Sequence, residues 1–107
     1  MKLVAVSACT AGIAHTYMTQ EAIEQECKKR GIDCKVETQG GMGINNELEQ
    51  DVFDDADVVI RAIASCIEGD DRVDEKRDEG KVIEVDPTQA IKDIKKLIDR
   101  AEALANE

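Results

Sequence analysis

Short apolar segments alternate with helical patterns along this chain of 107 residues, and this alternation restricts the possible folds more than any other feature. The segments 2–6 (KLVAV), 57–64 (DVVIRAIA) and 81–85 (KVIEV) are apolar and mostly β-branched, which is typical of buried strands. The segment 32–38 (IDCKVET) alternates apolar with charged residues, which predicts an edge strand with one wet face. Arg61 interrupts the second apolar segment, and we expect it to extend to solvent or to pair with a charge at one end of the strand.

Two helical patterns lie between these strands. The first covers 15–30, carries apolar residues at helical spacing, ends in basic residues and is stopped by Gly31. A second, short helix is expected to start at Asn45 or Asn46. Its apolar side chains should point inward: Leu48, Val52 and Phe53.

The last helix has the clearest start signal. Asp86 is a capping residue, Pro87 suits the first helical position, and Gln89 follows three residues after the cap. An apolar stripe then predicts one helix toward the end of the chain: Ile91, Ile94, Leu97, Ile98, Ala101, Leu104 and Ala105. Nine of the ten residues in 70–79 are charged, which predicts a solvated loop or a helical turn on the surface.

The order of elements predicts an α/β fold, a three-layer, doubly wound, Rossmann-like domain covering residues 1–107. Its open sheet has four parallel strands in the order 2-1-3-4, numbered along the chain, because right-handed crossovers and two-sided burial of the first and third strands favour that order. The length fits one domain with one core. Aromatic residues make up only 2% of the chain, so the core should consist of Val, Ile, Leu and Ala.

The charge balance excludes several classes of partner. A formal net charge of −10 disfavours nucleic acid and anionic membrane surfaces. No apolar stretch approaches the ~20 residues that span a bilayer, and the N-terminal apolar run is too short for a signal peptide. We therefore expect a cytoplasmic chain without direct membrane insertion.

A cysteine follows the first predicted strand, in the stretch VSACTAGIAHT (6–16). In a doubly wound sheet, ligands bind at the carboxyl ends of the strands where the strand order reverses, and Cys9 is expected at that point. The small residues from Thr10 to Ala14 leave room for backbone N–H groups to turn inward, and the following helix adds its first turn. Such a site stabilises a thiolate and also holds a phosphoryl group on its sulfur.

Cys9 by itself is compatible with several kinds of chemistry. The frame of a cysteine phosphatase is C-x5-R-[ST]; here the spacing holds and Thr16 fits, but His15 replaces the arginine that clamps phosphate oxygens. A redox pair of Cys9 with Cys66 is a further alternative, since Cys66 follows the neighbouring strand. Two other cysteines, Cys27 and Cys34, fall on inward faces and are expected in the core. Metal-ligand spacing is absent, so we expect no metal and no cofactor.

Two segments together resemble one family. ACTAGIAHTYM (8–18) resembles the cysteine loop of the fructose-family IIB components of the bacterial sugar phosphotransferase system, written A-C-P-T-G-I-A-H-T. VETQGGMGINNEL (36–48) is similar to the second segment of that family, V-E-T-Q-G-x-x-G-x-x-N-x-L. The chain departs from the pattern at Thr10 and Ala11, where the family has Pro-Thr and the proline stiffens the loop.

The resemblance implies a phosphocarrier. A phosphohistidine on a IIA component would give its phosphoryl group to Cys9, which would pass it to fructose, mannose or a related sugar during uptake through a membrane IIC transporter. The chain would then be a monomer that associates with IIC. His15 would assist by hydrogen bonding or capping, or would only pack. The phosphate-holding loop carries over residue by residue: Thr10, Ala11, Gly12, Ile13, Ala14, His15 and Thr16.

Overall fold

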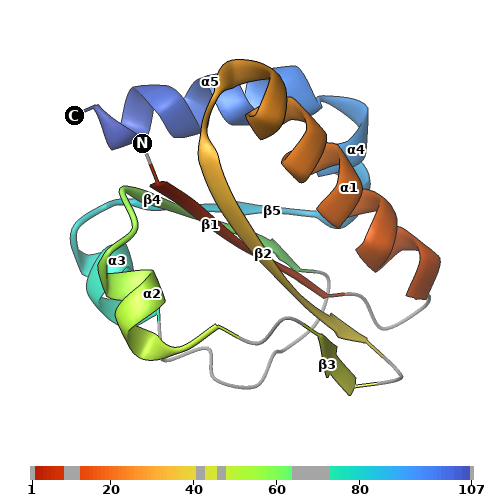
Figure 1. The fold of residues 1–107 in the computed structure, drawn as a ribbon, viewed down its shortest axis with the longest axis horizontal. Helices are drawn as coiled ribbons and strands as arrows, with labels where there is room; N and C mark the ends of the chain where they lie inside the picture. Colours follow the sequence, from red (N-terminus) through yellow and green to blue (C-terminus); the bar gives the residue numbers. More distant parts are fainter. Residues whose placement is uncertain (1, 9–12, 41–42, 46–47, 64–72, 107) are drawn as a thin grey trace.

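A computed structural model of the chain describes residues 2–8, 13–40, 43–45, 48–63 and 73–106. The described strands form one sheet in the order β3-β2-β1-β4-β5 (Figure 1). All pairs are parallel except β2 with β3. The strands are β1 (Lys2–Ala8), β2 (Asp33–Gly40), β3 (Gly43–Asn45), β4 (Val58–Ile63) and β5 (Val82–Val85).

The four parallel strands confirm the predicted order 2-1-3-4, as β2-β1-β4-β5. Strand β3 was not predicted, because its three residues are too few to show a strand pattern of their own. Strand β2 continues to Gly40, and the chain returns antiparallel with Thr38 opposite Asn45 and Gly40 opposite Gly43. The hairpin covers the carboxyl end of β2, whose backbone groups would otherwise stay unpaired at the sheet edge.

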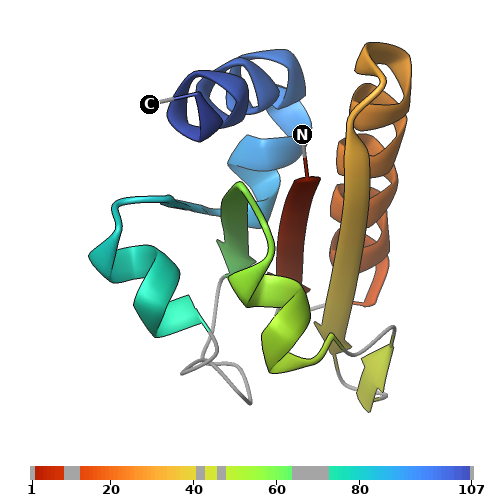
Figure 2. The same ribbon diagram turned by 60° about the vertical axis from the view of Figure 1, so that its left-hand side comes forward.

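Helices cover both faces of the sheet, as Figure 2 shows. One side, here called the α1 face, carries α1, α4 and α5; the other, the α2 face, carries α2 and α3. This confirms the three-layer, doubly wound arrangement. The helices are α1 (Ile13–Arg30), α2 (Gln50–Asp54), α3 (Asp74–Asp78), α4 (Pro87–Lys92) and α5 (Ile94–Ala105).

Each face has its own apolar cluster, and β1 contributes to both. On the α1 face, Leu3 and Ala5 pack with Ile23 and Cys27 of α1 and with residues of α4 and α5. The cluster on the α2 face combines every second residue of the central strands with residues that lie next to or within α2 and just before α3. Its buried members are Val4, Val6, Phe53, Ala56, Val59 and Val73. Aliphatic side chains dominate both clusters, as the composition predicts.

The predicted last helix is two helices. Asp86 caps α4 as predicted, because its Oδ1 accepts a hydrogen bond of 2.8 Å from the Thr88 N–H and Pro87 opens the helix. The chain then leaves helical geometry at Asp93, with φ −123° and ψ 44°. Aspartate is a poor helix former, and the break redirects the chain so that Ala90 of α4 and Ile98 of α5 reach the same cluster.

Helix α2 starts later than predicted. Asn45 belongs to β3, Asn46 lies outside the described residues, and Glu49 occupies the cap position without a side-chain hydrogen bond. The inward direction is confirmed: Phe53 is fully buried, and two partly buried side chains pack beside it, Leu48 and Val52. The cap prediction is wrong because the hairpin takes up Asn45.

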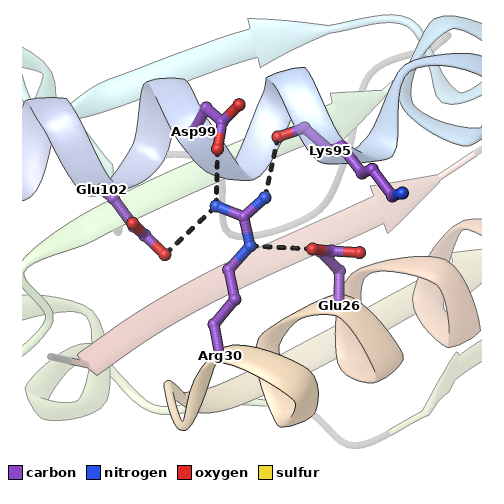
Figure 3. Close-up of polar contacts among 5 residues, drawn as sticks. All are labelled: Glu26, Arg30, Lys95, Asp99 and Glu102. Carbon is purple, nitrogen blue, oxygen red and sulfur yellow. Dashed lines mark hydrogen bonds and ion pairs between the residues drawn. The ribbon is translucent and has the colours of Figure 1, made fainter.

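The carboxyl end of α1 is tied to α5 by one guanidinium group (Figure 3). Arg30 donates from Nε to Glu26 at 2.8 Å, from Nη1 to Asp99 at 2.7 Å and to Glu102 at 3.2 Å, and from Nη2 to the Lys95 carbonyl at 3.3 Å. The hydrogen bond to Glu26 and the other acidic neighbours raise the pKa of Arg30 further above its ordinary value.

Three further local predictions can be compared with the structure, and the one for Arg61 is wrong about where along the strand the arginine pairs. Gly31 ends α1 in the left-handed region, at φ 70°, which confirms it as the helix stop. Arg61 pairs with Glu84, its direct neighbour across the β4–β5 ladder, so the misfit strand arginine is paired between strands and not at a strand end. In the charged segment, α3 is exposed and confirms a surface helical turn for the part that is described, while Val73 before it is buried.

Candidate phosphoryl-transfer site

The sequence predicts a site where β1 ends. Strand β1 stops at Ala8, whose neighbours across the sheet are Gln39 of β2 and Ile63 of β4. The connection from β1 to β2 runs over the α1 face and that from β2 to β4 over the α2 face (Figure 1), so the carboxyl end of β1 is the topological switch point. Cys9 directly follows Ala8 in the sequence.

The eight predicted site residues divide into two groups. Half lie outside the described residues: Cys9, Thr10, Ala11 and Gly12. The other half form the first turn of α1, which begins two residues earlier than expected: Ile13, Ala14, His15 and Thr16. Ile13 and Ala14 are therefore helical and not loop. The first N–H groups of this 18-residue helix have no partner within it, which suits an anion.

A buried carboxylate lies at the carboxyl end of β2, beside this position. Glu37 is fully buried, and its two oxygens accept hydrogen bonds of 2.7 Å each from the Leu48 N–H and from Nε2 of Gln39. The bond to Leu48 fixes the chain that leads from β3 to α2. The prediction of a wet face at Glu37 is wrong, because the side chain is fully buried and bonded to the Leu48 N–H.

Two buried hydroxyl residues face the other way, toward α1. Ser7 and Thr38 are direct neighbours in the β1–β2 ladder, and both are almost fully buried. Thr38 ends the alternating segment 32–38 and lies on the same strand face as its apolar residues. Among the residues that the structure describes, the Thr38 hydroxyl is a buried side-chain oxygen without a hydrogen-bond partner.

Helix α1 places further side chains near the same edge of the sheet. The Thr19 hydroxyl is buried and donates a hydrogen bond of 3.4 Å to the carbonyl of Pro87, which joins α1 to α4. Tyr17 and Met18 are exposed by 42% and 50%. Met18 belongs to the apolar pattern that predicts the helix over 15–30, but it is not buried, and it places a large apolar side chain on the surface close to the start of α1.

Two of the other three cysteines, Cys27 and Cys34, belong to the described part of the chain. Cys27 is fully buried and Cys34 partly buried within the α1-face cluster, as predicted. The neighbouring Cys27 thiol and burial raise the pKa of Cys34, and the neighbouring Cys34 thiol lowers the pKa of Cys27. Cys34 therefore stays protonated at neutral pH. Cys66 lies outside the described residues, so its approach to Cys9 stays a prediction.

No helix within the described ranges is long and apolar enough to cross a membrane. In the same part of the chain, no three His, Cys, Asp or Glu side chains gather in the way that a metal site requires. The polar groups that the structure does bring together at the carboxyl edge are Ser7, Glu37, Thr38 and Gln39.

Comparison with known proteins gives a consistent family. The family model described as "PTS system, Lactose/Cellobiose specific IIB subunit" matches residues 4–100. The "PTS system fructose-like EIIB component 2" of Escherichia coli K12 is 37% identical over 102 residues, which cover 95% of this chain and 92% of the relative. The "Fructose-like PTS system EIIBC component" of the same strain is 45% identical over 95 residues, 88% of this chain but only 19% of the relative.

A solved structure agrees with these sequence matches. The crystal structure titled as a predicted fructose-specific IIB from Escherichia coli superposes with a TM-score of 0.90 at 26% identity, covering 99% of this chain and 90% of that one. The chain therefore belongs to the IIB family of the phosphotransferase system, within its fructose-like group.

Proposed function

We propose that the chain is a phosphocarrier that takes a phosphoryl group from a phosphohistidine on a IIA component onto Cys9 and delivers it to fructose or a related sugar during uptake through IIC. The single observation that carries the proposal is the switch point: β1 ends at Ala8, one residue before Cys9, and α1 begins shortly afterwards at Ile13. The family membership supports the same reading.

The first transfer forms a phosphocysteine. The thiol of Cys9 loses its proton to solvent, and the N-terminal turn of α1 favours the resulting thiolate. The thiolate sulfur attacks the phosphorus atom of the phosphohistidine. An S–P bond forms as the P–N bond breaks, and the electron pair of the broken bond stays on the imidazole nitrogen of the donor.

The second transfer releases the phosphoryl group to the sugar. A sugar hydroxyl oxygen attacks the phosphorus atom, an O–P bond forms and the S–P bond breaks. The electron pair returns to sulfur, which restores the thiolate, and the hydroxyl proton passes to solvent. Catalysis of this kind rests on positioning and charge stabilisation. Backbone N–H groups of residues 10–16 hold the phosphoryl oxygens, with His15 assisting. The arginine clamp of a phosphatase is absent from position 15.

The names of the relatives support the partners in this proposal. One relative is named as an EIIBC component, which joins a B part with a C part, and another is named fructose-like. We place the chain in the cytoplasm as a monomeric single domain that docks on IIC. The exposed Tyr17 and Met18, next to the first turn of α1, offer a contact surface for the donor and the transporter.

The test is to incubate the purified chain with a phosphorylated IIA component and to locate the modification by mass spectrometry. We expect a mass increase of one phosphoryl group on Cys9, which is lost in Cys9→Ser and kept in the control Cys34→Ala. Full labelling of Cys9→Ser would contradict the proposal. Turnover of an aryl phosphate by the chain alone would favour a phosphatase, and an oxidant-induced link between Cys9 and Cys66 would favour a redox protein.

A further inference from the structure

Thr38 combines burial with an unused hydrogen-bond donor. Its side chain lies in the sheet at the carboxyl end of β2 with a residue exposure of 1%, and within the described part of the chain its Oγ1 has no hydrogen-bond partner. A buried hydroxyl that lacks a partner costs free energy, so such groups are rare and each needs an explanation.

The neighbouring buried polar side chains behave differently. Glu37 accepts from Leu48 and Gln39, and Glu26 accepts from Arg30. The Thr19 hydroxyl, which is equally buried, donates to the Pro87 carbonyl. Among the buried polar side chains that the structure describes, Thr38 is therefore an exception, and its place in the fold suggests what the hydroxyl binds.

The position of Thr38 in the sheet points toward the switch point. It pairs with Ser7, two residues before Cys9, in the parallel β1–β2 ladder. It also shares its strand face with Val36, which packs in the cluster of the α1 face with Ile23. Thr38 lies one side-chain repeat nearer the carboxyl edge than Val36, and so on the side of the sheet where α1 begins.

We propose that the Thr38 hydroxyl donates a hydrogen bond to a phosphoryl oxygen carried on Cys9, which makes Thr38 a phosphate-binding residue supplied by the second strand. The inference rests on the proposed phosphocysteine. Phosphoryl oxygens are anionic acceptors, and hydrogen bonds to charged groups are roughly twice as strong as neutral ones. The hydroxyl and the N–H groups of the first turn of α1 would then offer donors to these oxygens from one strand and one helix.

The experiment uses Thr38→Val, which removes the hydroxyl and keeps the shape, and Thr38→Ser, which restores the hydroxyl. Thr19→Val is the matched control, because it removes a buried hydroxyl that has a partner. Three quantities are measured: the thermal midpoint of unfolding, the rate of phosphoryl uptake from a phosphorylated IIA component, and the 31P resonance of the phosphocysteine.

We expect Thr38→Val to unfold at the same or a higher temperature, because no protein hydrogen bond is lost. Its uptake rate should fall roughly tenfold and its 31P resonance should shift, since a charge-assisted hydrogen bond to the phosphoryl group is gone. Thr38→Ser should recover most of the rate. Thr19→Val should unfold at a lower temperature and keep the wild-type 31P resonance.

Other outcomes overturn the inference. A Thr38→Val chain with the wild-type rate and 31P resonance shows that the hydroxyl does not touch the phosphoryl group. A Thr38→Val chain that loses stability as Thr19→Val does, with uptake reduced equally in both, assigns the hydroxyl a structural role. If the wild-type chain takes up no phosphoryl group on Cys9, the proposed function fails and this inference fails with it, whereas normal labelling of all variants removes only the role of Thr38.

Discussion

Glu37 is a carboxylate without solvent contact, and its two oxygens act as acceptors for the Leu48 N–H and the Gln39 amide. Replacing it by glutamine puts an NH2 group where one of these donors points, so one buried donor loses its acceptor. We expect Glu37→Gln to lower the free energy of unfolding by about 1–3 kcal/mol, measured by urea denaturation. The phosphoryl uptake rate should fall too, because the bond to Leu48 fixes the chain beside the carboxyl edge.

The matched control for Glu37 is Glu24, an exposed glutamate that accepts from Gln20 on the same helix. Glu24→Gln should change the free energy of unfolding by less than about 0.5 kcal/mol. Equal losses of unfolding free energy in the two variants would show that burial does not determine how much the Glu37 carboxylate contributes to stability.

At the scale of elements, the two helices at the end of the chain offer a comparison of two aspartates. Asp86 caps α4 through the Thr88 N–H, whereas Asp93 precedes α5 without a side-chain cap hydrogen bond. We expect Asp86→Ala to lower the free energy of unfolding by about 0.5–2 kcal/mol. Asp93→Ala should stay within about 0.5 kcal/mol of the wild type. Urea denaturation of both variants checks this, and a larger loss for Asp93→Ala would refute the assignment of the cap.

The parallel strands were predictable because their signals are local. Apolar β-branched runs predict β1, β4 and β5, and the alternation from Ile32 to Thr38 predicts β2. Strand β3 has only three residues, Gly43–Asn45, and owes its form to pairing with β2 rather than to any pattern of its own. The break at Asp93 depends on how α4 and α5 pack on the sheet. The apolar stripe continues through this position, so the sequence pattern does not predict the break.

The candidate site was predictable only where chain topology decides it. The end of the central strand β1 at Ala8, one residue before Cys9 in the sequence, could be predicted from the strand pattern, while the place and the phosphorylation of Cys9 stay predictions. Burial of Glu37 could not be predicted, because its partner Leu48 comes from a segment eleven positions away. The unused hydroxyl of Thr38 also needed the structure, since the sequence shows only that it lies on the inward face of the strand.

At the scale of the whole molecule, β1 joins the two apolar clusters. Its residues alternate between them, with Leu3 and Ala5 on the α1 face and Val4 and Val6 on the α2 face. A loss of packing on one face therefore loosens the strand on which the other face also depends. We infer that the two clusters unfold as one cooperative unit, which is what a single domain requires.

Phe53→Ala and Ile60→Ala test this inference from opposite faces, since Phe53 is fully buried on the α2 face and Ile60 on the α1 face. Each should lower the free energy of unfolding by about 2–5 kcal/mol, while Met18→Ala, at an exposed site, should change it little. In each core variant, amide hydrogen exchange should show α5 losing protection by the same free energy that the whole variant loses, although Phe53 lies on the other side of the sheet. Unchanged protection of α5 in Phe53→Ala would mean that the α2 face opens independently, and the chain would then behave as two layers with separate stabilities.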